Sequence, residues 1–383
     1  MLETPFLEDH HRSLAEQVDS FVQEHVRGVA QGNTEEDQCR LLIRSLARAG
    51  LLSHTIPVGF SSGESFLDVR ALCIVRDHLS YESSLADLMF AMQGLGSFPV
   101  ALAGSDEIRN RLLPKVKSGD AIAAFAITEP EAGSDVSAIQ TTARRDGSSY
   151  VIDGIKTFIS NAGLADFYTV FAKTDTTAGS KGISAFVVEK ETAGFYLDAK
   201  IDLIAPHPIG RLRFDGCRVP ALHRIGEEGA GFKIAMTTLD TFRPTVGAAA
   251  LGLASRAFDE AIKYARQRVQ FGRPISEFQA IQMKLAEMAT DLDAARLLVY
   301  RAAWKKDTAA GRITLESAMA KLFATEAAQR IIDASVQIHG GTGVVVGSVV
   351  ERLYREVRAL RIYEGTSEIQ KLVIAGQLVR DVL

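Results

Sequence analysis

Apolar positions recur with helical spacing over the first hundred or so residues. Leu14, Val18, Phe21 and Val22 stand at positions i, i+4, i+7 and i+8, which is one apolar stripe of an amphipathic helix. The pattern predicts a helical region that ends near residue 118. The further helices expected there cover residues 35–49, 66–81, 84–93 and 106–117, with a loop at residues 55–63 that is rich in Pro, Gly and Ser.

The periodicity changes near Gly119. From Ile122 to about Gly226 the apolar residues form short runs that are separated by turn signals, and Asp146-Gly147 between two such runs predicts a hairpin. Consecutive short strands without intervening helices predict a small antiparallel barrel or sandwich. The expected strands cover residues 141–145, 149–152, 167–172, 183–189, 195–201 and 211–214.

Helical spacing resumes after Gly231. The expected long helices lie around residues 251–265, 278–299 and 314–338, and a last helix begins near Ser367. Along the second of these, apolar residues step by three and four alternately, which predicts a seam against another helix in a bundle or between subunits. The seam consists of Phe278, Ile281, Leu285, Met288, Leu292, Ala295 and Val299. We therefore expect an α+β multidomain chain with helical, β and helical domains at residues 1–118, 119–226 and 227–383.

Composition narrows the classes of function. Of the 383 residues, 47% are hydrophobic and 23% charged, and the net charge of -4 with a pI of about 6.1 gives no basic field for nucleic acid. The three cysteines, Cys39, Cys73 and Cys217, form no CxxC pair, so a disulfide scaffold or zinc cluster is not expected. The N-terminus lacks a signal-peptide pattern, and no run of eighteen apolar residues predicts a membrane span. These features favour a cytoplasmic protein without a bound metal.

Two segments of the predicted β-domain carry candidate chemistry. In FAITEPEAGSD, Gly133 permits close backbone approach, and Thr128 and Ser134 offer hydroxyls to a polar ring or a phosphate. From composition alone, an ordinary strand-to-loop exit is the commoner explanation. In KTFISNA, Phe158 and Ser160 are two residues apart and are expected on one side of a strand, where they would stack on and bond a flat cofactor. More often, the two residues of such a pair belong simply to the protein core and surface and bind no ligand.

Two further segments lie at predicted helix ends. Arg268 in RVQFGRPI can bond a pyrophosphate, or it can simply complement the helix dipole. The glycine-rich QIHGGTG can hold a nucleotide, although Gly-Gly is also a routine helix stop. It is neither a Walker nor a Rossmann loop, and the chain has no HExxH or GxSxG motif.

The segment RIYEGTSEIQ places a carboxylate, Glu364, behind an apolar-aromatic pair and ahead of a glycine and two hydroxyls. This arrangement suits a base that is partly desolvated yet able to move onto a substrate. Most Glu-Gly-Thr triplets are nevertheless surface turns, so the assignment depends on the other segments.

In this order and at these spacings the segments resemble the acyl-CoA dehydrogenases from about residue 10 to the end. The motifs are FAITEPEAGSD, KTFISNA, RVPALHRIGEEGAGFKIAM, ARQRVQFGRPISEFQAIQMKLAEM, QIHGGTG and RIYEGTSEIQ. The resemblance implies a helical N-terminal domain, a middle β-domain and a C-terminal four-helix bundle around FAD. This arrangement agrees with the plan drawn from periodicity.

The resemblance also implies roles for individual residues. The implied flavin contacts of the β-domain are Phe125, Ile127, Thr128, Gly133, Ser134, Phe158 and Ser160, where Phe158 replaces the usual Trp and Ser160 the usual Thr. The implied FAD contacts of the C-terminal part, some of them to a neighbouring subunit, are Arg268, Phe271, Ile275, Gln279, Gln337, Gly341, Thr366 and Glu368. The implied thioester contacts are Ser134, Asp240, Phe242, Arg243, Tyr363 and Gly365. Glu364 stands at the position of the catalytic base. A minority of the family has its catalytic base at another position, which is occupied here by Phe242, and a phenylalanine cannot take a proton.

The implied reaction is α,β-dehydrogenation of an acyl-CoA to a trans-2-enoyl-CoA, as in fatty acid metabolism, by a homotetramer that reduces an electron-transfer flavoprotein. Three stretches depart from the family pattern: TIPVGFSSG, IAPHPIGR and VVVGSVV, and the last two flank the expected acyl and carrier entrance. Substrate identity therefore stays open. The same reaction on an acyl-carrier-protein thioester is the nearest alternative. A flavin monooxygenase and a non-catalytic, nucleic-acid-protecting relative are others, and the retained Glu364 argues against both.

Overall fold

The computed structural model describes residues 4–27, 34–59, 66–309 and 311–380. Residues 60–63 of the predicted loop lie outside this part, and Val58, just before them, forms an antiparallel bridge with Phe66. The chain divides into two compact units. One comprises Met1–Arg27, Val69–Asp87 and Asp240–Leu383, and the other comprises Gly28–Asp68 and Leu88–Leu239.

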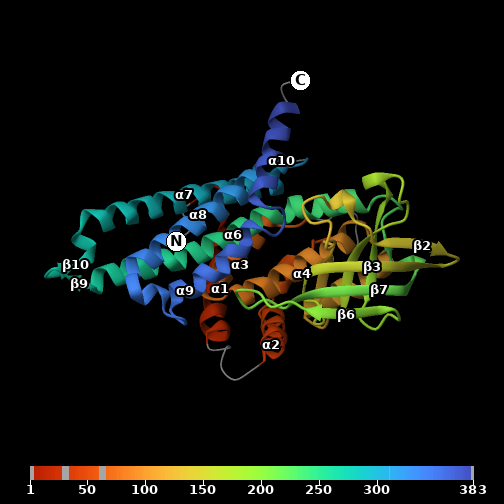
Figure 1. Ribbon diagram of the computed structural model, residues 1–383, viewed down its shortest axis with the longest axis horizontal. Helices are drawn as coiled ribbons and strands as arrows, with labels where there is room; N and C mark the ends of the chain where they lie inside the picture. The colour runs from red at the N-terminus through yellow and green to blue at the C-terminus, as the bar shows by residue number, and fades with distance from the viewer. Residues whose placement is uncertain (1–3, 28–33, 60–65, 310, 381–383) are drawn as a thin grey trace. The chain divides into compact units, whose positions relative to one another are not determined.

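The first unit is helical. Figure 1 shows its long helices α7 and α8 side by side, and these two helices are in extensive contact. Its helices are α1 (Asp9–Phe21), α3 (Val69–Glu82), the part of α6 (Gly231–Gln267) from Asp240 onward, α7 (Gln279–Thr308), α8 (Thr314–His339), α9 (Val349–Val357) and α10 (Ser367–Arg380). Helix α6 comes close to α7 at Gly247, where a Cβ atom would lie 2.7 Å from Cγ2 of Val299. A larger residue at this position would push the two helices apart.

The predicted seam on α7 is buried in only one half. Met288, Leu292, Ala295 and Val299 are buried, whereas the preceding members of the seam are partly exposed. The second half of the prediction is therefore confirmed as bundle core. The first half keeps an apolar face that the described residues cover only in part.

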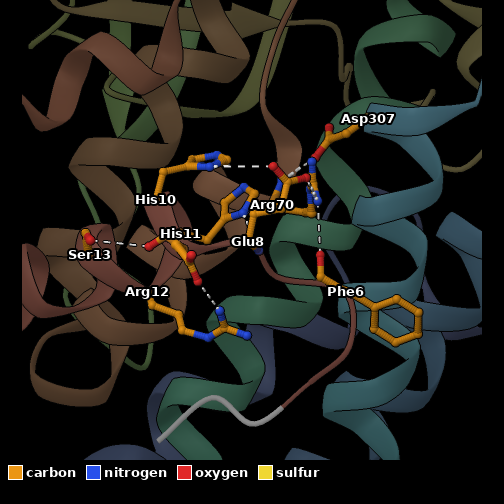
Figure 2. Close-up of polar contacts among 9 residues, drawn as sticks. Phe6, Glu8, His10, His11, Arg12, Ser13, Arg70 and Asp307 are labelled. Carbon is orange, nitrogen blue, oxygen red and sulfur yellow. Dashed lines mark hydrogen bonds and ion pairs between the residues drawn. The ribbon is translucent and has the colours of Figure 1, made fainter.

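Arg70 attaches the N-terminal segment to the helices of this unit. Its guanidinium donates to Glu8 at 2.8 Å, to the Phe6 carbonyl at 3.0 Å and to Asp307 on α7 at 2.8 Å (Figure 2). Asp307 also accepts from the backbone N–H of Val69 at 2.8 Å, and so satisfies a free donor at the start of α3. Three segments far apart in sequence thus meet at one buried arginine.

The second unit is built on one sheet. Its strands are β1 (Ala123–Ala126), β2 (Thr142–Asp146), β3 (Ser149–Ser160), β4 (Phe167–Lys173), β5 (Ile183–Glu189), β6 (Phe195–Lys200), β7 (Ile209–Pro220) and β8 (Arg224–Ile225). The order is β6-β7-β3-β2-β4-β5-β8, and β1 pairs with β4. Most pairs are antiparallel as expected, whereas β1 runs parallel to β4 and one parallel pairing joins β2 to β4. Helices α2 (Glu35–Arg48), α5 (Asp106–Ser118) and most of α4 (Ser84–Ala103) complete the unit.

The predicted end of α4 at Gln93 is wrong, because the helix continues to Ala103. Gly96 does not stop it. A Cβ on this residue would lie 2.7 Å from the Ala124 nitrogen, so the glycine allows the helix to lie against β1. Among the described helices, α4 is long and apolar enough to cross a membrane, but 83% of its apolar window is buried inside the protein, as in a core helix.

The Asp146-Gly147 hairpin is confirmed, with Asp146 paired to Ser149 and Gly147 at φ 59°. Strand β3 extends well beyond the predicted residue 152 and contains two register shifts against β7. The second shift lies between Lys156 and Ile159 and includes Phe158. The bulge interrupts the alternation just before Phe158, because Lys156 and Thr157 are both buried. From there the pattern resumes, with Phe158 exposed, Ile159 buried and Ser160 partly exposed.

Candidate active site

A tight turn at residues 363–365 precedes α10 and carries Glu364. The φ angle of Glu364 is 53°, and that of Gly365 is 95°. Glycine adopts such angles without strain, but a residue with a Cβ loses roughly 1–2 kcal/mol there. The surrounding contacts must therefore hold Glu364 in this conformation.

Three helices bind the carbonyl groups of this turn. Arg243 on α6 donates to the Glu364 carbonyl at 3.2 Å, and Gln370 on α10 donates to the same oxygen at 3.2 Å. Lys321 on α8 donates to the Gly365 carbonyl at 2.8 Å, and Gln370 also reaches that oxygen at 3.1 Å. Both carbonyls of the strained turn are thus fixed by side chains that come from separate helices.

The Glu364 carboxylate is desolvated and available. Its Oε2 atom is buried and has no hydrogen-bond partner among the described residues. Burial raises the pKa of Glu364, while the charges of Arg76, Lys321 and Arg243 act against that rise. A carboxyl group with a raised pKa and an unused oxygen is suited to accept a proton from a bound molecule.

A buried ion pair lies next to the turn. Arg76 on α3 binds both oxygens of Asp87 at 2.7 and 2.8 Å and the Thr245 hydroxyl at 2.9 Å. Arg76 also interacts with the Tyr363 hydroxyl, whose pKa is raised by burial. Sequence reasoning missed Arg76, Asp87 and Lys321, because no local pattern distinguishes a charged residue that will be buried from one on a helix surface.

Asp240 acts within the protein as the anchor of Arg243. Its two carboxylate oxygens accept from Arg243 at 2.7 Å, from Arg312 at 2.9 Å and from Thr314 at 2.7 Å. Arg243 in turn holds the Glu364 carbonyl. The structure therefore brings the predicted substrate residues Asp240, Arg243, Tyr363 and Gly365 together around the predicted base, Glu364. Phe242 lies buried on α6, next to Arg243 in the chain.

A second group of predicted residues lies at the other end of the bundle. Arg268 follows α6, and Phe271 is at the tip of the hairpin formed by β9 (Val269–Gln270) and β10 (Arg273–Pro274), with φ 51° and 94% exposure. Ile275 and Gln279 come next in the chain, at the start of α7.

The end of α8, with Gln337 and Gly341, lies at this same end, because His339 stacks on Tyr264 of α6 with ring centres 4.4 Å apart. Sixteen residues separate Lys321 from Gln337 on α8, which corresponds to roughly 24 Å of helix. The predicted cofactor residues of the bundle therefore do not form one cluster. Thr366 and Glu368 lie next to the 363–365 turn, at the start of α10, and the Arg268 group lies far from them.

In the β-unit, Lys156 connects two predicted segments. Its Nζ atom donates to the Ile127 carbonyl at 3.0 Å and to Glu129 at 2.7 Å, and the Thr157 N–H donates to the Thr128 carbonyl at 2.9 Å. The FAITEPEAGSD loop therefore lies along the bulge of β3 that carries Phe158. Burial lowers the pKa of Lys156 to about 8, against the opposite effect of the Glu129 carboxylate.

The predicted residues of this unit differ in exposure. The side chains of Phe125 and Ile127 are buried, and Phe125 packs on Phe171 with ring centres 4.9 Å apart. Phe158 is 57% exposed with φ 53°. Gly133 and Ser134 are exposed, and a Cβ at Gly133 would meet open space. Phe158, Gly133 and Ser134 are therefore open to a ligand, whereas the side chains of Phe125 and Ile127 are enclosed by the protein.

His207 is a site residue that the sequence reasoning did not select. One of its ring nitrogens, Nε2, lies 2.7 Å from the Ser160 hydroxyl. Burial lowers the pKa of His207 to about 4, so the ring is neutral at ordinary pH. The signal was the IAPHPIGR stretch, whose departure from the family pattern pointed only to substrate identity.

Known proteins resemble this chain along almost its whole length. Three family models match, described as the N-terminal, middle and C-terminal domains of acyl-CoA dehydrogenase, at residues 8–120, 124–217 and 229–379. A 3-(aryl)acrylate reductase of Clostridium sporogenes is 39% identical over 98% of this chain and 100% of its own length. The short-chain specific acyl-CoA dehydrogenase of Rattus norvegicus mitochondria is 43% identical over 88% of this chain and 82% of its own. The solved butyryl-CoA dehydrogenase of Megasphaera elsdenii aligns with a TM-score of 0.90 and 34% identity, covering 97% of this chain and 99% of its own.

Proposed function

This chain belongs to the acyl-CoA dehydrogenase family, and we propose that Glu364 is the base that removes the α-proton of its thioester substrate. As a member of this family the chain is an oxidoreductase that acts on CH–CH bonds of acyl-CoA and uses FAD. The observation that carries the proposal is the buried, unpartnered Oε2 atom of Glu364 in a turn that three helices hold.

The residues present fit FAD. Phe158 and Phe271 are exposed aromatic side chains held at positive φ, and aromatic faces of this kind stack on flat rings. Open space around Gly133 and Gly341 permits close approach of a ligand to the backbone. In our proposal Phe158 and Ser160 hold the flavin ring, and Arg268 and Phe271 reach the FAD of a neighbouring subunit. When bound, oxidised FAD supplies the acceptor for the two electrons that leave the substrate with the β-hydrogen as hydride.

Glu364 performs the other half of the reaction. The α-proton of a thioester is far less acidic than a carboxylic acid, so the carboxylate must be made more basic than in water. Burial does this by raising the pKa of Glu364. The fixed turn keeps the carboxylate in one place, which spares the cost of orienting it at the moment of transfer. Loss of the α-proton to Glu364 and of the β-hydrogen as hydride leaves a trans-2-enoyl thioester.

Replacing Glu364 by Gln tests the assignment. The variant keeps the shape of the side chain but cannot accept a proton, so we expect FAD binding to persist while reduction by substrate slows by about 100-fold to 10⁴-fold or more. The measurement is anaerobic bleaching of the flavin absorbance in a stopped-flow instrument, with FAD content as the control. Near-normal reduction in the variant would remove Glu364 as the base.

The acyl group is best identified by the same bleaching assay. A panel of straight, branched and cyclic acyl-CoAs, extended by arylpropionyl-CoA because one relative is a 3-(aryl)acrylate reductase, separates the substrate classes. Turnover with an acyl-carrier-protein thioester but not with the acyl-CoA would favour the carrier protein as the group that carries the acyl chain. We further propose an electron-transfer flavoprotein as the oxidant, which stopped-flow mixing with the reduced protein tests.

We also propose a homotetramer in the cytoplasm. Support for assembly comes from the half-covered first part of the α7 seam and from apolar side chains exposed close to it, which are Val269, Phe271 and Met283. Support for a reducing compartment comes from the three cysteines, all of which are buried and in the thiol form. Analytical ultracentrifugation of the FAD-bound protein tests the assembly, and a monomer would contradict it.

A further inference from the structure

Lys321 is a buried cation with an unusual partner. It lies on α8 with no exposed surface, and its Nζ atom donates to the Gly365 carbonyl at 2.8 Å. No carboxylate lies within ion-pair distance of it among the described residues, although buried lysines are normally paired. The hydrogen-bond partner of this buried ammonium group is therefore a backbone oxygen of the Glu364 turn.

The position of this cation links it to the base in two ways. Its hydrogen bond fixes the peptide group directly after Glu364, and so restrains the strained backbone from which the carboxylate extends. Its charge also acts on the carboxylate itself. Among the charged neighbours of Lys321, Glu364 has the largest effect, and it opposes the burial that lowers the pKa of Lys321 to about 8.

Resting on the assignment of Glu364 as the base, we propose that Lys321 is a positioning residue of the reaction, which fixes the Gly365 carbonyl and provides buried positive charge beside the Glu364 carboxylate. The two effects have separate consequences. Loss of the hydrogen bond loosens the turn and lowers the rate of proton removal. Loss of the charge disfavours the ionised base, so that a higher pH is needed to form it.

Other charged groups face Glu364 or Lys321 from the packed elements, and they set the background for this test. They are Arg76 of α3, Asp87 of α4, Arg243 of α6, Glu326 of α8 and Glu368 of α10. Arg76 is bound to Asp87, and Arg243 is bound to Asp240. Both arginines thus have a carboxylate partner, whereas Lys321 has none among the described residues. Its removal changes the charge beside Glu364 without breaking an ion pair.

Two substitutions separate the two effects. Lys321→Met removes both the donor and the charge, and Lys321→Gln restores a neutral donor of similar length. We expect the Met variant to reduce its flavin at least about tenfold more slowly at saturating substrate and to need a higher pH, by roughly one unit, to reach its maximal rate. The Gln variant should recover much of the rate. The acid limb of its pH–rate profile, which is the rise in rate as Glu364 loses its proton, should stay displaced to higher pH as in the Met variant. FAD content and thermal unfolding of each variant check folding, and the Gln variant carries the test if the Met variant does not fold.

The measurement is the rate of anaerobic flavin reduction as a function of pH, in wild type and in both variants. An acid limb that stays at the wild-type pH in the Lys321 variants would overturn the proposal, since a purely structural lysine lowers the amount of active protein without moving the limb. Failure of the base assignment is recognised separately, because then Glu364→Gln retains reduction. If Glu364→Gln is inactive and the limb of Lys321→Met does not move, only the role of Lys321 is refuted.

Discussion

Removal of Lys156 tests how the loop at residues 127–129 is held against β3. Lys156 has no exposed surface and binds the Ile127 carbonyl and Glu129. In Lys156→Met the aliphatic part of the side chain is kept, but Glu129 stays buried without its cation. It keeps the backbone N–H groups of Gln140 and Thr141 as donors, at 2.5 and 3.0 Å. Removing one partner of a buried ion pair lowers the free energy of unfolding by about 3–5 kcal/mol, because the other charge stays buried without a partner. We expect a loss in that range.

The assay is urea unfolding followed by far-UV circular dichroism, with the free energy extrapolated to water. Lys190→Met is the matched control, because Lys190 forms an ion pair with Asp166 at a similar 2.7 Å but at a partly exposed site. We expect the control to lose no more than about 1 kcal/mol. The difference between the two lysines then measures burial rather than the mere presence of an ion pair.

A second variant decides whether the unpaired charge is the cause. Adding Glu129→Gln to Lys156→Met removes the charge and keeps an oxygen for one of the two backbone donors, which bind different oxygens of Glu129. The double variant should therefore regain part of the lost free energy. A loss below about 1 kcal/mol in Lys156→Met, or no recovery in the double variant, would refute the reasoning.

Two further predictions concern His207 and Asp240. Because burial lowers the pKa of His207 to about 4 from 6.5, the unfolded chain takes up this proton first as the pH falls. Wild type should therefore lose up to about 3 kcal/mol of unfolding free energy between about pH 7 and pH 4 that His207→Gln does not lose, and equal slopes in urea unfolding would contradict this. Asp240→Asn removes the negative charge that Arg243 and Arg312 share and leaves one neutral oxygen for the two arginines, so we expect a loss of about 2–3 kcal/mol in the same assay. An unchanged midpoint would show that these contacts do not stabilise the protein.

The sequence predicted those parts of the fold that depend on local chemistry. Asp146-Gly147 specified its hairpin, and the three- and four-residue steps on α7 predicted the buried positions from Met288 onward. The prediction was incomplete where contact with a segment distant in sequence determines the local structure. The helix predicted to end at Gln93 continues to Ala103, with Gly96 lying against β1, and the bulge before Phe158 becomes visible only in the pairing of β3 with β7.

The same limit applies to the site. Glu364 and the aromatic residues were found because short motifs carry them, and the family resemblance assigned their roles. Lys321, Arg76 and His207 lie in segments without a recognised motif or in one that departs from the family pattern. Their importance depends on burial and on partners distant in sequence, such as the Gly365 carbonyl and Asp87. No window of the sequence contains that information.

The positive φ angles of Phe158, Phe271 and Glu364 have a consequence for engineering. Each costs roughly 1–2 kcal/mol, so together they amount to about 3–6 kcal/mol, against a typical net stability of about 5–15 kcal/mol. A search for heat-resistant variants would select glycine at all three positions, since glycine relieves the strain. Each gain would remove a side chain that we assign to the cofactor or to proton transfer. In this protein, the substitutions that best improve thermal resistance and those that abolish activity are expected at the same three positions.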